Sequence, residues 1–197
     1  MTDRPCSGPP FDDGRDALAA LLAAHADRWP EQADVADLFL RFLASHPAVF
    51  ERSHGVGHFT GAAWLVSGDG VRVLLTHHRK LGRWLQLGGH ADGDTDLARV
   101  ALREAEEESG LAGLTVWPDI FDLDRHRIPA RGSEPEHWHY DVRFVVRAGA
   151  SESFVVGPES HDLAWRSIVD LVADAEIDRS IRRMAGRWLD RPLAIDG

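Results

Sequence analysis

The segment that most constrains this chain runs from Gly88 to Leu111, with the sequence GGHADGDTDLARVALREAEEESGL. It begins with two consecutive glycines, which let neighbouring groups approach the backbone closely. It ends with Gly110, a residue type that commonly closes a helix in the left-handed conformation, followed by apolar Leu111. Between these ends, apolar residues recur at helical spacing, and Asp94 or Thr95 is the expected N-cap. The segment therefore predicts a glycine-rich loop that leads into one helix.

Carboxylates continue the apolar face of this predicted helix. At about 100° per residue, one face carries three apolar residues and then three glutamates, whereas Glu106 points nearly the opposite way. Like charges three or four residues apart cost about 0.2–0.5 kcal/mol each, and negative charge opposes the dipole at a helix C-terminus. A hard divalent cation such as Mg²⁺, which prefers carboxylate oxygens, offsets this repulsion; a solvated acidic helix end is the alternative. The face consists of Leu97, Val100, Ala101, Glu104, Glu107 and Glu108.

The same segment resembles the Nudix box of the MutT-like Nudix hydrolase family. That box has a glycine, five residues, a glutamate, seven residues, and then Arg-Glu-U-x-Glu-Glu-x-Gly-U, where U is a bulky aliphatic residue. Residues 103–111, REAEEESGL, match the second half, and Gly89 lies at the required distance before Arg103. Two positions depart from the pattern: Thr95 replaces the first glutamate, and Ala105 is smaller than the usual U. The resemblance covers Gly89 to Leu111.

This resemblance implies a metal-dependent hydrolase that cleaves the diphosphate linkage of a nucleoside diphosphate derivative. Water attacks phosphorus, and Mg²⁺ or Mn²⁺ stabilises the charge that develops. Arg103 is implied to orient Glu104, and Gly89 to contribute its carbonyl to the metal. The residues implied in catalysis and metal binding are Arg103, Glu104, Glu107, Glu108 and Gly89. The family often supplies its general base from a later loop, for which the candidates are Glu134, Glu136 and Glu159.

Polar residues outside the box are candidates for substrate binding. A basic loop from His77 to Arg83 precedes the acidic segment in a chain of net charge −10, and it is expected to attract an anionic substrate. Arg125 and Arg127 share one face of a predicted strand, so they are candidates for contacts with phosphate or ribose. Solvated surface charge is the alternative for the arginines. The full set of substrate-binding candidates is Arg79, Arg83, Arg125, Arg127 and Asp141.

His137 and His139 share a strand parity, which would suit a second metal site, and Asp141 shares that face. With no third ligand at matching spacing, we interpret them as packing residues or as residues at the edge of the substrate site.

Strand and helix patterns on both sides of the box predict an α/β (α+β) domain, and the resemblance implies the Nudix α/β/α sandwich with a mixed sheet. An N-terminal helical hairpin is expected to pack on this core. The chain divides into a flexible tail (1–13), the helical hairpin (14–48) and the Nudix domain (49–197). The expected helices cover 14–28, 31–45, 167–172 and 178–189, and the expected strands 59–66, 71–75, 114–117, 120–128, 137–147 and 160–165.

Composition excludes several other classes of protein. The net charge of −10 argues against a binder of nucleic acid polymers, which neutralises phosphates with clustered Lys and Arg. No run approaches the roughly 20 apolar residues of a membrane span, and the N-terminus lacks the apolar region of a secretory signal. We therefore expect a cytoplasmic monomer or homodimer that binds a small nucleoside diphosphate-type molecule.

Two alternative functions stay open within the same fold. One is a non-catalytic nucleotide-binding or regulatory Nudix module, although such modules usually lose the box carboxylates that this chain keeps. The other is an isomerase, since isopentenyl diphosphate isomerases share the fold; these enzymes depend on a catalytic cysteine, and the single cysteine, Cys6, is poorly placed for it. The substrate also stays open among ADP-ribose-like compounds, (deoxy)nucleoside triphosphates and dinucleoside polyphosphates.

Overall fold

A computed structural model describes residues 13–79, 82–132, 134–157 and 160–190 of the chain. Its centre is a seven-stranded sheet in the order β3-β2-β1-β6-β5, with β4 pairing to β1 and β7 to β2. β1 and β6 run parallel and the other pairs are antiparallel, so the sheet is mixed, as expected. The strands are β1 (Gly57–Val66), β2 (Arg72–His78), β3 (Arg83–Leu85), β4 (Leu87–His90), β5 (Thr115–Ile128), β6 (His137–Arg147) and β7 (Ser160–Ser167).

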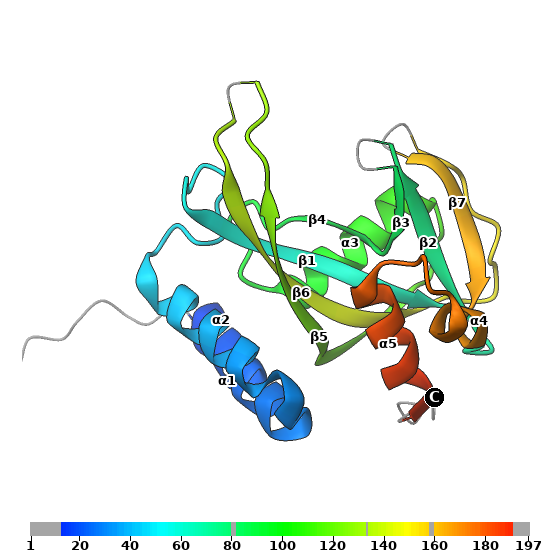
Figure 1. Ribbon diagram of the computed structural model, residues 1–197, viewed down its shortest axis with the longest axis horizontal. Helices are drawn as coiled ribbons and strands as arrows, with labels where there is room; N and C mark the ends of the chain where they lie inside the picture. Colours follow the sequence, from blue (N-terminus) through cyan, green and yellow to red (C-terminus); the bar gives the residue numbers. More distant parts are fainter. Residues whose placement is uncertain (1–12, 80–81, 133, 158–159, 191–197) are drawn as a thin grey trace, which may run out of the picture.

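Helices cover both faces of the sheet (Figure 1). Alternate residues of β1 enter two apolar clusters: Ala63 and Leu65 pack with the helix after the glycine-rich loop, whereas Trp64 and Val66 pack with the C-terminal helices. This alternation is the period of two that a strand buried on both faces requires. The expected α/β/α layering of an α+β domain is therefore present. The helices are α1 (Asp13–Arg28), α2 (Ala33–Ser45), α3 (Leu97–Ser109), α4 (Ile168–Ala173) and α5 (Arg179–Asp190), with a 3₁₀ turn at Pro30–Gln32.

The N-terminal helices α1 and α2 lie side by side (Figure 1). They pack on the sheet through aromatic rings. Phe42 stacks on Tyr140 with ring centroids 3.7 Å apart, and Phe39 meets the same ring edge-on at 5.2 Å. Gln32, in the turn between the helices, donates from its side chain to the carbonyl of Leu123 on β5 (2.9 Å). These contacts join the helical hairpin to the apolar core. The division of the chain at residues 13 and 48 stays a prediction, and the tail before Asp13 lies outside the described residues.

A buried network of charges links the hairpin, β5, β6 and α5. Its centre is Asp122, a fully buried residue of β5. Asp122 accepts hydrogen bonds from Arg143 (3.2 Å), Arg183 (2.7 Å) and Arg187 (2.9 Å). Arg187 also donates to Gln32 (3.0 Å), which carries the network to the hairpin. Buried charges persist only when they are paired and hydrogen-bonded, so this network fixes the relative positions of four elements.

Several details differ from the sequence-based predictions. The two strands expected at 114–117 and 120–128 form one strand, β5, whose pairing with β6 shifts register around Ile120. A β-bulge of this kind keeps a strand continuous although its side-chain alternation is broken. The N-cap predicted at Asp94 or Thr95 is wrong: the capping side chain is that of Asp96. Within the described residues, no helix is both long and apolar enough to cross a membrane.

Candidate active site

Helix α3 is capped at both ends, by Asp96 and by Gly110. The carboxylate of Asp96 accepts from the backbone N–H of Arg99 (3.1 Å) at the first turn. At the other end, Gly110 takes a φ of 67° and its N–H donates to the carbonyl of Glu106 (2.8 Å). An L-residue with a side chain rarely adopts that conformation. The predicted glycine cap at the end of the helix is therefore confirmed. The helix therefore begins and ends at fixed points relative to the loop before it.

Pairing between β1 and β4 places the glycine-rich loop against this helix. Gly89 lies opposite Gly61 on β1, and both glycines face α3. A Cβ atom on Gly61 would lie 2.8 Å from the carbonyl oxygen of Leu97, and one on Gly89 would lie 2.4 Å from the carboxylate of Glu104. The absence of side chains at these two positions is therefore what lets the helix, and Glu104 with it, come so close to the sheet.

Arg103 links Glu104 to the strand that carries the glycine pair. One guanidinium nitrogen of Arg103 donates to the carboxylate of Glu104 (2.9 Å) and to the backbone carbonyl of His90 (3.0 Å). Burial raises the pKa of the Glu104 carboxyl, and the hydrogen bond from Arg103 opposes this effect only in part. Glu104 is thus a half-buried carboxylate whose charged form gains from an additional positive partner.

The other two box glutamates differ in their surroundings. Glu108 is half-buried, and its carboxylate accepts from the backbone N–H of Gly88 (2.9 Å). Glu107 is exposed. Of the three glutamates predicted to continue the apolar face, Glu104 and Glu108 therefore lie against the two glycines, whereas Glu107 does not. The carboxylate oxygens of the three glutamates do not all lie within 4.8 Å of one another. Among the described residues, only one other group of metal-binding side chains meets that distance.

The donor set fits a hard divalent cation. Two carboxylates, those of Glu104 and Glu108, converge on the backbone of a glycine pair, and oxygen donors of this kind are the ligands that Mg²⁺ and Mn²⁺ prefer. Mg²⁺ needs few protein ligands, because it keeps several waters and accepts substrate phosphate oxygens. The carboxylates that crowd this glycine pair are therefore suited to hold such an ion.

The residues around Thr95 have structural tasks of their own. Asp94 accepts two hydrogen bonds from the guanidinium of Arg99 (2.6 and 3.0 Å), and Asp96 caps α3. Both carboxylates beside Thr95 are thus used in building the start of the helix. Because each already has a structural role, neither of these two carboxylates is available to replace the first glutamate of the Nudix box as a ligand.

The candidate substrate-binding residues lie on different sides of the sheet. Arg125 and Arg127 pair across β5–β6 with Tyr140 and Trp138, and they share the sheet face of α3. The guanidinium of Arg125 lies 4.1 Å from the ring centroid of Trp138. Arg127 forms an ion pair with Glu136.

Asp141 lies on the opposite face, almost fully buried. It accepts from Thr60 (3.0 Å), Gln86 (3.0 Å) and Arg143 (2.7 Å). Its carboxylate is therefore part of the buried network as well as a candidate substrate contact.

The basic loop contributes residues at the far edge of the sheet. Arg79 is exposed just after β2. Arg83 lies 3.9 Å from Asp178 and, with Trp84, lines an open hollow of about 530 Å³ between β3 and the start of α5. The role of these arginines in substrate binding stays a prediction.

Two of the three candidate general bases lie in described parts of the chain. Glu134 faces His137, with 3.9 Å between its carboxylate oxygen and the ring nitrogen. The negative charges of Glu134 and Glu104 both raise the pKa of Arg52. Glu136 is engaged by Arg127. Glu159 lies outside the described residues, as does Cys6, so the structure places neither.

Five histidines gather on the sheet face that carries Asp141. His58 on β1 pairs directly with His139 on β6, and His90 on β4 lies beside them. Ring centroids are 4.7 Å apart for His58 and His139, and 5.0 Å for His58 and His90. The rings of His126 and His137 lie 5.3 and 5.1 Å from that of His139.

Sequence reasoning did not find this cluster. It treated His137 and His139 as lacking a third partner, because the additional histidines lie about 50 and 80 residues away in the chain. Only the pairing of β1 with both β4 and β6 brings His58, His90 and His139 together. The one indication in the sequence was the number of histidines, 11 in 197 residues. That number does not show which histidines lie close together in the fold.

Comparisons with known proteins agree with this architecture. A family model described as "NUDIX domain" matches residues 57–186. An Ap4A hydrolase of C. elegans in a binary complex superimposes with a TM-score of 0.53 at 16% identity, covering 67% of this chain and 95% of its own. The E. coli dihydroneopterin triphosphate pyrophosphohydrolase gives 0.55 at 17% identity, with coverage of 67% and 94%. The M. smegmatis Nudix hydrolase RenU gives 0.51 at 23% identity, with coverage of 69% and 88%. No curated protein matches the chain.

Proposed function

Because the chain belongs to the Nudix family of pyrophosphohydrolases, we propose that it cleaves the diphosphate linkage of a nucleoside diphosphate derivative with Mg²⁺ or Mn²⁺ as its cofactor. Water attacks one phosphorus, a P–O bond to that water forms, and the bridging P–O bond breaks. The attacking water loses its proton to a base, and the leaving phosphate takes up charge. The observation that carries the proposal is the convergence of Glu104 and Glu108 on Gly88–Gly89.

Each box residue has a distinct task in this proposal. Glu104 and Glu108 would hold the divalent cation, with Glu107 assisting from its exposed position and Gly89 adding its carbonyl. Arg103 keeps Glu104 oriented by donating to its carboxylate and, at the same time, to the backbone of β4. When bound, the ion would neutralise charge on the diphosphate as the bridging bond breaks.

Glu134 is the best supported of the three candidate bases. Its charge acts on both His90 and Arg52, and the charge of Glu104 acts on Arg52 as well. Arg52 is thus within electrostatic range of both carboxylates. Glu136 is paired with Arg127 instead. We accordingly propose Glu134 as the base that receives the proton of the attacking water.

The substrate is proposed only as a class. Neighbours of the same fold are named for Ap4A and for dihydroneopterin triphosphate, so the fold itself does not choose among phosphate anhydrides. Arg79, Arg83, Arg125, Arg127 and Asp141 stay the proposed contacts for the remainder of such a substrate.

A substrate panel tests the function. ADP-ribose, nucleoside triphosphates and dinucleoside polyphosphates are incubated with the protein in Mg²⁺ or Mn²⁺, and products are separated by chromatography. We expect metal-dependent cleavage of at least one compound, with ¹⁸O from labelled water in a phosphate product. Glu108→Gln and Glu134→Gln should lose activity, whereas Glu136→Gln should keep it. An absence of metal-dependent turnover across the panel, or full activity in Glu108→Gln, would contradict the proposal.

Gly89→Ala tests the close approach of the glycine pair to Glu104. The new Cβ would lie 2.4 Å from the Glu104 carboxylate, which must then move away from the loop. Because that carboxylate is the end of a flexible side chain, we expect the free energy of unfolding to change by less than about 1 kcal/mol. Activity on the identified substrate should nevertheless fall at least about tenfold. Urea unfolding and steady-state kinetics measure the two effects; retained activity would show that the contact is not needed.

A further inference from the structure

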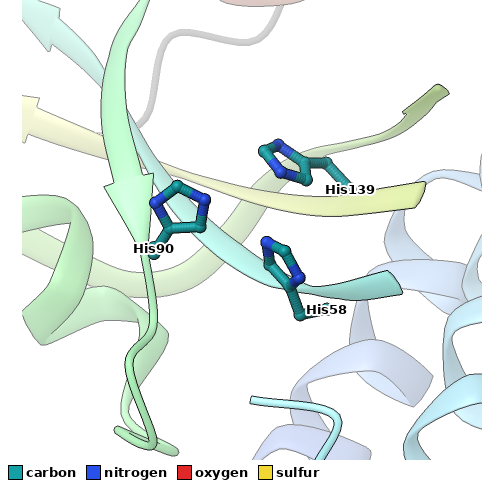
Figure 2. Close-up of side chains that lie close together, drawn as sticks. All are labelled: His58, His90 and His139. Atoms are coloured by element: carbon teal, nitrogen blue, oxygen red, sulfur yellow. The ribbon is translucent and has the colours of Figure 1, made fainter. Parts of the chain in front are cut away.

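We propose that His58, His90 and His139 form a second metal site, for a transition-metal ion of the Zn²⁺ type, on the sheet face opposite α3. Within the described residues, this is the one group of at least three metal-binding side chains whose ligand atoms all lie within 4.8 Å of one another. Figure 2 shows the three rings turned toward a common space from three different strands. The site is separate from the carboxylates of the Nudix box and does not depend on their function.

The geometry suits an imidazole-bound ion. With Zn–N distances of about 2.0–2.1 Å, nitrogens on a tetrahedral ion lie about 3.4 Å apart. The three side chains reach this spacing by tilting inward, since each is attached to a neighbouring strand of one sheet. Three protein ligands leave the fourth position of a tetrahedral ion open. His90 and His139 are only half-buried, so an ion has a path to the site.

An unpaired side chain is the second observation. His58 is fully buried, and neither of its ring nitrogens has a hydrogen-bond partner among the residues that the structure describes. Buried polar groups are normally satisfied, so such a histidine marks the place of a missing partner. A cation shared with His90 and His139 would supply the missing partner, because it would accept the nitrogen lone pair of His58.

The residues next to the triad would support an ion. The Nδ1 nitrogen of His137 faces the carbonyl of Pro135 (2.9 Å), and because a carbonyl only accepts, this nitrogen carries the proton. With the proton on Nδ1, the Nε2 of His137 can accept a hydrogen bond from the Nε2–H of His139, which lies 3.2 Å away. Outer contacts of this kind orient metal-binding histidines. Glu134, 3.9 Å from His137, adds a negative charge at the rim.

The choice of metal follows from the donors. Imidazole nitrogens suit Zn²⁺, Cu²⁺, Ni²⁺ and Co²⁺, whereas Mg²⁺ prefers oxygen ligands. The two proposed sites of this chain thus differ in chemistry, although β4 joins them. Gly89 faces Glu104 on one side of that strand, and the next residue, His90, belongs to the triad. Arg103 binds the carbonyl of His90 and the carboxylate of Glu104 together.

Zinc titration in the presence of excess Mg²⁺ tests the site. Chelator-treated full-length protein carrying Cys6→Ser, which removes the only thiol, is titrated with Zn²⁺ by calorimetry. Co²⁺ is then added to a separate sample, and its visible absorption reports nitrogen coordination. We expect one equivalent of Zn²⁺ to bind and to raise the melting temperature. Glu104→Gln should bind Zn²⁺ as the parent does, which separates this site from the box.

Histidine variants decide the assignment. His90→Gln and His139→Gln should weaken Zn²⁺ binding by more than about 100-fold, and His137→Gln by about 10- to 100-fold. His161→Gln, an exposed histidine on β7, is the matched control and should leave the affinity unchanged. Because His58 is fully buried, the two half-buried positions are used, and circular dichroism verifies that each variant is folded. No stoichiometric Zn²⁺ binding by the parent, or equal binding by His90→Gln and His139→Gln, would overturn the proposal.

Discussion

Replacing Glu104 by glutamine is expected to lower kcat/KM by about 10²- to 10³-fold, which corresponds to about 3–4 kcal/mol of transition-state stabilisation. Glutamine keeps the size of the side chain but removes the negative charge that faces Arg103 and the glycine pair. The proposed divalent cation would lose one of its two half-buried carboxylates. Steady-state kinetics over a range of Mg²⁺ concentrations should show a higher metal requirement as well as a lower kcat.

Glu106→Gln is the matched control for this prediction. It makes the same chemical change two residues along the same helix, but Glu106 is exposed. An exposed substitution changes a free energy by about 0.5 kcal/mol or less, so kcat/KM should stay within about twofold of the parent. Equal losses in the two variants would indicate that the charge of the whole helix, rather than the position of Glu104, supports catalysis.

Asp122→Asn is expected to lower the free energy of unfolding by about 3–5 kcal/mol. Asp122 is fully buried and is the common acceptor for Arg143, Arg183 and Arg187. Asparagine keeps the shape but leaves three guanidinium groups without this counter-charge, and it places a donor amide among them. Because Arg187 also reaches Gln32, the loss is expected to loosen the helical hairpin together with α5. Urea unfolding followed by circular dichroism measures the change.

Asp119→Asn provides the comparison on the same strand. Asp119 pairs with Arg28 at 3.4 Å, but its side chain is 66% exposed. Exposed ion pairs contribute about 0–1 kcal/mol, so this variant should unfold within about 1 kcal/mol of the parent. If Asp122→Asn proved as stable as Asp119→Asn, the buried network would not be what ties the hairpin to the sheet.

Features that depend on neighbouring residues could be predicted from the sequence. The helix over Leu97–Ser109 and its glycine cap follow from spacing within a few residues, and both are present. The strand at His137–Arg147 has the predicted bounds, because its alternation is unbroken. At Ile120 the register shift interrupts the pattern, so one strand was predicted as two. The N-cap was misplaced by one or two residues because Asp94, Thr95 and Asp96 are all residue types that can cap a helix.

Features that depend on strand pairing could not be predicted in the same way. The contact of Gly89 with Glu104 needs β4 to pair with β1, across a separation that no local pattern reports. The roles of the box residues are still predictions, although the positions of Arg103, Glu104 and Glu108 now give them a physical basis. The three arginines around Asp122 come from β6 and α5, and no spacing rule connects them with β5.

The sequence by itself determined the family resemblance, the α+β class and the carboxylates of the box, because each depends on residue types at fixed short spacing. Only the tertiary structure decided which carboxylates lie against the glycine pair, and it alone assembled His58, His90 and His139. The physical reason is that a sheet brings residues together by register between strands. Register depends on the packing of the whole sheet, not on the order of residues along any one strand.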